Sequence, residues 1–147
     1  MKAEELMVGD LVRVNKDNIC IKKDTIVAVR GVDADNNLQK KGLVGGATCV
    51  PIYDADRMSG GVWCDFLEPI PFTEEYLVKN GFKKVGKQWE YYDDYFDLTI
   101  YEWSDSIWVF RYESTEMNTP HEQFTFSYIH ELQHAFRFCA VNMEIVL

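Results

Sequence analysis

The chain has 147 residues, with 47% hydrophobic and 27% charged side chains and a formal net charge of −9. This composition excludes a disordered or fibrous chain and predicts one or two small folded domains. No apolar run approaches the ~20 residues of a membrane span, and the opening "MKAEELMVGD" lacks the apolar core of a signal peptide, so we expect a cytoplasmic protein that does not enter a membrane.

The charge is unevenly spread along the chain. Residues 1–70 hold 9 Lys/Arg and 11 Asp/Glu, whereas residues 71–147 hold 6 Lys/Arg and 13 Asp/Glu. Nucleic-acid binding requires Lys and Arg to neutralise phosphates, so direct binding to nucleic acid is disfavoured. The acidic charge is most simply that of a solvated surface. It can also meet a basic protein partner, and one alternative is an acidic decoy that occupies a nucleic-acid-binding protein.

Short β-branched and aromatic segments, separated by turn residues, dominate the first seventy residues. They predict five strands, over residues 11–14, 19–21, 25–32, 47–52 and 61–67. Five short strands entered through a Gly9-Asp10 turn are typical of a small SH3-like β-barrel, which we predict over residues 1–70. Barrels of this kind serve many functions, so the fold alone indicates none.

Four cysteines are scattered along the chain without a C-x-x-C pair. In a reducing compartment such residues are most simply buried thiols. A metal cluster of Cys20, Cys49 and Cys64 is the less favoured alternative.

The stretch "LEPIPFTEEYLVKNGF" marks a predicted domain boundary. Pro69 and Pro71 force extended backbone and end the last strand of the barrel. Thr73 then fits the cap of a two-turn helix that ends near Gly81. Residues 71–147 are predicted to form a separate α+β domain, with a short helix, an antiparallel sheet and a C-terminal helix.

The sheet of this domain is predicted from four segments, over residues 87–92, 95–103, 106–113 and 122–126. The second and third segments fit a hairpin with Trp103 opposite Ser106, which places Ile100 opposite Val109. In this register one face is aliphatic, and we expect the C-terminal helix to cover it.

The other face of the same hairpin is aromatic. In the predicted register it gathers five large side chains, Tyr101, Trp103, Trp108, Phe110 and Tyr112. If this face is covered, it packs on the barrel or on the first short helix. If it is exposed, an aromatic patch of this size marks a protein interface or a contact between copies of a homo-oligomer. We therefore take these residues as the candidate interaction surface.

The last helix is predicted over residues 128–141, with Ser127 as its cap and Asn142 as its left-handed exit. It contains the pattern H-E-x-x-H, in which His130 and His134 lie four residues apart and share a helix face. Two such histidines can bind zinc while Glu131 acts as general base towards a zinc-bound water. The same residues also suit the polar face of an amphipathic helix.

A zinc hydrolase also needs a third protein ligand. The usual downstream position for a third histidine holds Ala140, so the candidates are Glu144, past the predicted helix end, and His121, upstream. We therefore predict no metal cofactor and favour a solvated polar helix face, with zinc as the alternative.

Three stretches resemble a family of small uncharacterised proteins from Bacteroidetes, their phages and mobile elements. They are "AEELMVGDLV", "EPIPFTEEYLVKNGFKK" and "YIHELQHAFRF", which occur in the family's order. The family pattern reads "ELRIGN-x-V", "PIPLTEEWLLKFGF" and "YVHQLQNLYFALTG", with Gln in place of Glu131 and Asn in place of His134. The resemblance implies a phage or mobile-element setting, implies no particular reaction, and indicates that a zinc-binding pattern does not define the family.

The favoured prediction is a non-enzymatic binding or adaptor protein that contacts a protein partner through the aromatic face. Two alternatives remain. One is a zinc-dependent hydrolase with His130 and His134 as ligands and Glu131 as base. The other is the acidic decoy.

Overall fold

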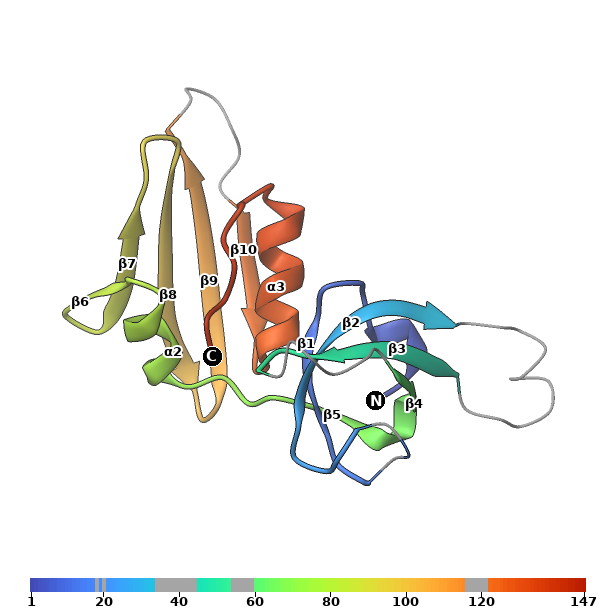
Figure 1. The fold of residues 1–147 in the computed structure, drawn as a ribbon. Coiled ribbons are helices and arrows are strands. Elements are labelled where there is room, and N and C mark those ends of the chain that lie inside the picture. Colours follow the sequence, from blue (N-terminus) through green and yellow to red (C-terminus); the bar gives the residue numbers. More distant parts are fainter. Residues whose placement is uncertain (18, 20, 34–44, 54–59, 116–121) are drawn as a thin grey trace. The chain divides into compact units, whose positions relative to one another are not determined.

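A computed structural model covers the chain and describes all residues except 18, 20, 34–44, 54–59 and 116–121. The chain divides into two compact units, Met1–Ile70 and Pro71–Leu147. Each unit contains one five-stranded antiparallel sheet, and the second also has a C-terminal helix, so the fold is α+β (Figure 1). In the described part of the chain, no helix is long and apolar enough to cross a membrane.

The first unit is built almost entirely from short strands. Its elements are η1 (Ala3–Glu5), β1 (Leu11–Val14), β2 (Ile26–Asp33), β3 (Gly46–Pro51), β4 (Gly60–Trp63), η2 (Cys64–Phe66) and β5 (Leu67–Pro69), where η marks a 3-10 turn. The strand order is β4-β3-β2-β1-β5. Because β4 and β5 are separate edges, the sheet is open, and a closed SH3-like barrel is not confirmed. The strand predicted at 19–21 is wrong at Ile19 and Ile21, which lie outside any strand.

Alternate residues of the strands form the core of the first unit. Val12 and Val14 of β1 and Val27 and Val29 of β2 are fully buried, as the two-residue period of a half-covered strand requires. The carboxylate of Asp10 is also buried, and its Oδ2 accepts a hydrogen bond of 2.8 Å from the backbone N–H of Met7. This bond closes the turn that leads into β1.

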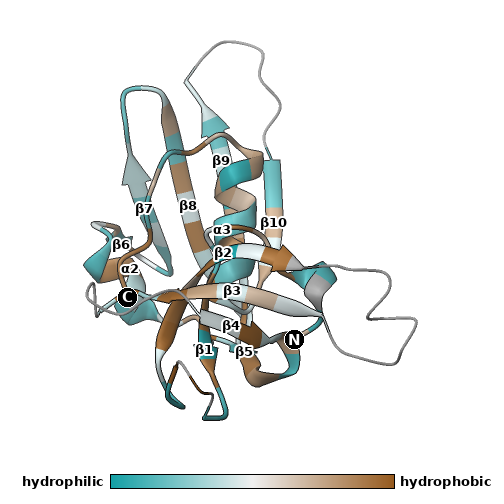
Figure 2. Cartoon of the chain, turned by 45° about the vertical axis from the view of Figure 1, so that its right-hand side comes forward, coloured by the Kyte–Doolittle hydropathy of each residue, from teal (hydrophilic) through white to brown (hydrophobic). Residues whose placement is uncertain are grey.

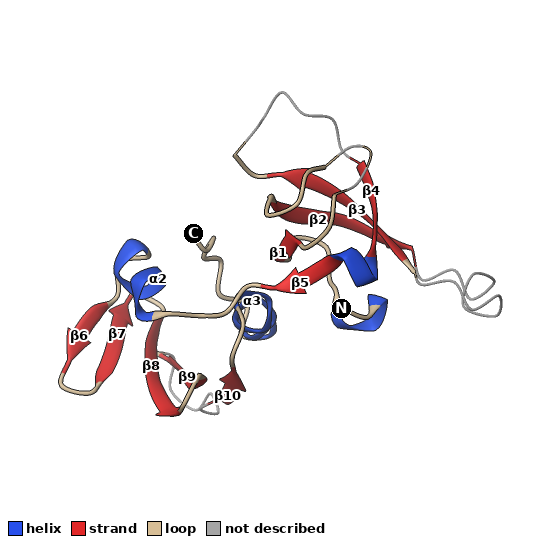
Figure 3. Cartoon of the chain, turned by 90° about the horizontal axis from the view of Figure 1, so that it is seen from below, coloured by secondary structure: helices blue, strands red, loops and turns tan. Residues whose placement is uncertain are grey.

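The second unit is a five-stranded sheet with two helices. Its elements are α2 (Glu74–Lys79), β6 (Lys83–Val85), β7 (Gln88–Tyr92), β8 (Phe96–Ser104), β9 (Ile107–Ser114), β10 (Glu122–Phe126) and α3 (Ile129–Phe138). The strand order is β10-β9-β8-β7-β6. Both helices lie on the same side of this sheet (Figure 3), and hydrophobic residues alternate with hydrophilic ones along the central strand β8 (Figure 2).

The register of the β8–β9 hairpin differs by one residue from the prediction. Ile100 lies opposite Phe110, not opposite Val109. The turn is centred on Asp105 and Ser106, with Ser106 at φ 62°, and a bulge between Glu102 and Ser104 leaves Trp103 without an opposite residue. Side chains alternate between the two faces along a strand. A shift of one residue therefore places every β9 side chain on the face opposite to the one that the predicted register gave it.

Aromatic side chains of β9 therefore face the helices. Phe110 is fully buried, and its ring centroid lies 5.3 Å from that of Phe136 on α3. Phe72, just before α2, packs edge-on against Trp108 at 5.1 Å and against Phe126 of β10 at 4.9 Å. Edge-to-face pairs at these distances are favourable beyond the area that they bury.

Both helices end in the same hydrogen-bonded motif. At the end of α2, Gly81 has φ 81°, its N–H donates to the carbonyl of Val78, and the N–H of Phe82 donates to the carbonyl of Leu77. At the end of α3, the equivalent left-handed residue is Ala140, with φ 55°. These are Schellman ends, for which glycine is the usual left-handed residue. The prediction of Asn142 as the helix exit is wrong by two residues.

Ala140→Gly is expected to raise the free energy of unfolding by about 1 kcal/mol, because an L-residue is strained in the left-handed region. Gly81→Ala is the matched reverse change and is expected to lower it by a similar amount. A methyl group at Gly81 would meet only ordinary contacts, the nearest being Tyr91 at 3.9 Å, so the backbone alone would be strained. Urea denaturation measures the change in the free energy of unfolding for both variants. If both changes raised it, or both lowered it, the prediction would be contradicted.

Candidate functional site

The two histidines of the H-E-x-x-H pattern lie close together on α3. Their ring centroids are 5.7 Å apart and the rings are nearly perpendicular. His130 is buried, with 6% of its surface exposed, and its ring stacks on Tyr128 at 6.0 Å. His134 is half-buried. The prediction of a solvated polar face is therefore wrong for His130.

Glu131 caps the helix on which it lies. Its Oε2 accepts hydrogen bonds from the backbone N–H of Ser127 at 2.7 Å and of Tyr128 at 3.2 Å. A carboxylate at the third helical position satisfies donors that a helix start leaves open and favours the positive end of the helix dipole. Tyr128 is the residue before the helix, so the predicted capping role of the Ser127 side chain is wrong. The residue that a zinc mechanism would use as base thus has a structural role.

No third metal ligand joins the histidine pair in the part of the chain that the structure describes. There, no group of three or more His, Cys, Asp or Glu side chains is arranged to hold a metal ion. The upstream candidate, His121, lies outside the described residues, and the downstream candidate, Glu144, is exposed beyond the end of α3. The donor set is incomplete for a catalytic zinc, which requires three protein ligands.

Glu131→Ala is expected to lower the free energy of unfolding by about 1–2 kcal/mol, because two backbone donors lose a charged acceptor. Glu131→Gln keeps an acceptor oxygen and is expected to cost less. Glu144→Ala removes an exposed carboxylate and serves as the matched control. Urea denaturation gives the comparison, and equal stabilities for Glu131→Ala and Glu144→Ala would contradict the capping role.

The five residues of the candidate interaction surface lie on different sides of the second sheet. Phe110 and Trp108 are buried at 0% and 5% exposure on the helix-covered side, and Tyr112 is half-buried on that same side. Tyr101 lies on the opposite side, where the guanidinium of Arg111 stands 5.8 Å from its ring centroid. Trp103, at the bulge, is 72% exposed.

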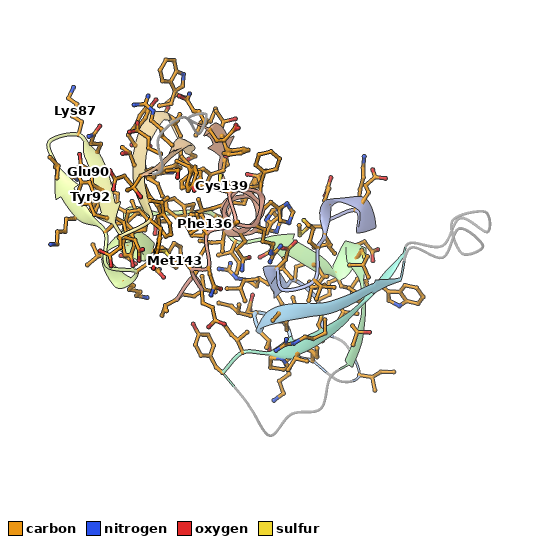
Figure 4. All side chains as sticks on the ribbon, turned by 90° about the horizontal axis from the view of Figure 1, so that it is seen from above. Lys87, Glu90, Tyr92, Phe136, Cys139 and Met143 are labelled. Carbon is orange, nitrogen blue, oxygen red and sulfur yellow. The ribbon has the colours of Figure 1, made fainter. Side chains whose placement is uncertain are left out.

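The side of the sheet opposite the helices, which we call the outer face, carries further residues that the prediction missed. Pairing places Gln88, Glu90 and Tyr92 of β7 on the same face as Tyr101. Their side chains form a chain of hydrogen bonds, because the Tyr92 hydroxyl and the Gln88 amide both donate to the Glu90 carboxylate. Glu90 and Tyr92 lie along one strand (Figure 4). The alternation Gln-x-Glu-x-Tyr in the sequence was the signal available for this face.

The hydrogen bonds along β7 shift the pKa values of two groups on the outer face. The pKa of Glu90 is lowered, first by the hydrogen bond from Tyr92 and then by that from Gln88. The same bond to Glu90 raises the pKa of Tyr92. At neutral pH this strand therefore presents a carboxylate flanked by a neutral phenol and an amide, which is an acceptor for a basic side chain.

The described cysteines are poor nucleophiles. Cys49, Cys64 and Cys139 are free thiols. Burial raises the pKa of Cys49 to about 12 and, with a smaller effect of Glu122, that of Cys139 to about 11. Burial also raises the pKa of Cys64. Since the thiolate is the reactive and metal-binding form, raised pKa values disfavour both roles. Cys49 and Cys64 are buried as predicted, whereas Cys139 is half-buried and Cys20 lies outside the described residues.

A scan against protein-family models, a search of curated proteins and a search of solved structures gave no match. The resemblance described from three sequence stretches therefore stays a prediction.

Proposed function

We propose that the protein is a non-enzymatic binding or adaptor protein that contacts a protein partner through the outer face of its second sheet. The observation that carries this proposal is the combination of the Tyr101–Arg111 pair with two exposed aromatics, Tyr92 at 62% and Trp103 at 72% exposure. Tyrosine, tryptophan and arginine are the residues that most often dominate the binding energy of protein interfaces.

The charge of the second unit supports a basic partner. Residues 71–147 hold 13 Asp/Glu against 6 Lys/Arg, and Glu90 adds a carboxylate to the outer face. Charge complementarity of this kind raises association rates and selects against acidic partners. The acidic decoy is the form of this proposal in which the partner is a nucleic-acid-binding protein.

Two finer proposals accompany it. The first unit is proposed to be a variant of the SH3-like barrel. The support for this is that its first strand, β1, pairs both with β2 and with the last strand, β5. A phage or mobile-element setting is proposed from the three stretches "AEELMVGDLV", "EPIPFTEEYLVKNGFKK" and "YIHELQHAFRF" alone.

Site-specific photo-crosslinking tests the proposed surface. Benzoylphenylalanine is placed at Tyr92, Tyr101 or Trp103 of the full chain in cells, and at Tyr53, a 70% exposed tyrosine of the first unit, as control. We expect one basic protein to be captured from the two outer-face positions, Tyr92 and Tyr101, and from Trp103 at the bulge, and not from Tyr53, with a yield that falls as salt rises. Capture that is equal from all four positions would overturn the proposal, and release of nucleic acid from the captured protein would identify the decoy.

The zinc-dependent hydrolase remains as a second candidate because the rings of His130 and His134 lie 5.7 Å apart on one helix. Elemental mass spectrometry of tag-free protein, beside His134→Ala, decides it. Stoichiometric zinc that is lost in the variant would support a metal site. Absence of zinc after incubation with it would remove this candidate.

A further inference from the structure

Residues 141–147, which we call the strap, follow α3 and run back to α2 (Figure 1). They have no helical or strand structure, yet their exposure alternates. Val141 is buried, Met143 and Ile145 are half-buried, and the residues between them are exposed. This is the two-residue period of an extended segment that presses one edge against an apolar surface.

The surface beneath the strap is a groove between the two helices. Its walls include Leu77 and Phe82 from the α2 side and Leu132 and Phe136 of α3, and Met143 and Ile145 of the strap also line it. Phe136 and Met143 lie close together (Figure 4). Apart from Asn80, the lining residues that the structure describes are aliphatic or aromatic, so the groove favours apolar side chains at alternate positions.

Asn80 binds the backbone of the strap at the far end of the groove. Its amide nitrogen donates to the carbonyl of Val146 at 2.9 Å, and its amide oxygen accepts from the N–H of Val146 at 2.8 Å. The same amide nitrogen also donates to the carbonyl of Tyr76 at 2.7 Å, which orients the side chain. A side chain that bonds both backbone groups of one residue recognises an extended peptide without regard to its side chains.

The hinge between α3 and the strap is strained. Ala140, at φ 55°, turns the chain back so that the strap reaches the groove of its own molecule. A left-handed alanine is unfavourable, and opening the hinge releases this strain while it breaks the bonds from the N–H groups of Ala140 and Val141 to the end of α3. The strap would then leave its own groove while keeping a sequence that fits that groove.

We propose that the strap is exchanged between two copies of this chain, each copy filling the interhelical groove of the other. A second copy carries the one segment whose fit to this groove is seen in the structure. The groove contacts and the Asn80 bonds are the same in the closed and the exchanged forms, so the hinge decides between them. Exchange of an identical element gives a two-fold dimer in which each partner completes the site of the other.

Hinge variants of the full chain test the exchange. Ala140→Gly removes the strain from the closed form and is expected to lower the dimer association constant roughly 25-fold, because each of two hinges contributes a factor of about five. Ala140→Pro excludes a positive φ, so the closed form is lost and the dimer is expected to predominate. Light scattering during size-exclusion chromatography, over a range of concentrations, measures both effects.

Isotope-mixed crosslinking shows whether the strap is the exchanged element. Light copies labelled with photo-methionine are mixed at high concentration with heavy-isotope copies, and crosslinks from Met143 are located by mass spectrometry. We expect light-to-heavy crosslinks from Met143 to residues of α2 and α3 in the dimer fraction. The proposal is overturned if wild-type Met143 crosslinks only within copies, or if Ala140→Pro folds and stays monomeric at every concentration.

Discussion

Replacing Phe110 by alanine is expected to lower the free energy of unfolding of the second unit by about 3–5 kcal/mol, the range for a large aromatic removed from a packed core. Phe110 is fully buried between sheet and helix, with its ring 5.3 Å from Phe136 and 6.1 Å from Phe124. The surrounding rings come from different elements, so they cannot all move to fill the space that the phenyl group leaves. Hydrogen exchange of amides in the second unit, followed in urea, gives the change.

Trp103→Ala is the matched control for this prediction. Trp103 comes from the same hairpin and is larger than Phe110, but it is 72% exposed at the bulge. Its removal is therefore expected to change stability by no more than about 0.5 kcal/mol. If Trp103→Ala cost as much as Phe110→Ala, the two side chains would share an environment, as in the register predicted from the sequence, and the observed register would be wrong.

The sequence predicted the elements of the second sheet better than their pairing. The strand at Glu122–Phe126 has the predicted bounds, and β7, β8 and β9 differ only at their ends. The alternation of apolar and polar residues is a local signal, so a strand can be predicted from its own residues without knowing which strand it pairs with. Register depends on the turn. Ser106 takes a left-handed conformation, which is usually indicated in a sequence by Gly or Asn and here is not. The bulge at Trp103 then shifts the pairing again.

β6 was not predicted, because its residues do not alternate between apolar and polar. Its three residues, Lys83, Lys84 and Val85, are all exposed. It is held by its antiparallel pairing with β7. Lys84 adds contacts of its own: it bonds both carboxylate oxygens of Glu74 on α2, at 3.0 and 3.1 Å, and its ammonium stands 5.1 Å from the ring of Trp89. These bonds lower the pKa of Glu74. Such a strand is defined by its pairing with β7, which the pattern of its own three residues does not contain.

The candidate site was predicted in composition but not in geometry. The spacing of His130 and His134 correctly placed both on one helix face, and their rings are neighbours. The spacing of the two histidines does not indicate where the helix begins. The first residue of the helix decides the role of Glu131. Because α3 begins at Ile129, Glu131 falls at the third position and reaches back to Ser127 and Tyr128. One residue of difference in a helix boundary thus changes a proposed base into a cap.

Alkaline pH is expected to destabilise the first unit through Cys49. Its thiol is fully buried, and its pKa is raised from 9.0 to about 12, first by burial and then by the neighbouring Cys64. A raised pKa means that the folded state retains a proton that the unfolded state loses. The stabilisation is fully present below pH 9 and is lost between pH 9 and about 12, at about 1.4 kcal/mol per pH unit for this one thiol.

Cys49→Ala isolates this contribution from the other groups that titrate at high pH. The variant leaves a small cavity in the core, and the cost of that cavity is independent of pH. Urea denaturation at several values between pH 7 and pH 11 should therefore give two stability curves that run parallel below pH 9 and converge above it, the wild-type falling more steeply. Every tyrosine and lysine titrates alike in both proteins, so the difference between the curves reports Cys49 together with its interaction with Cys64. Curves that stay parallel to pH 11 would show that Cys49 ionises equally in the folded and unfolded states, and that water reaches it in the fold.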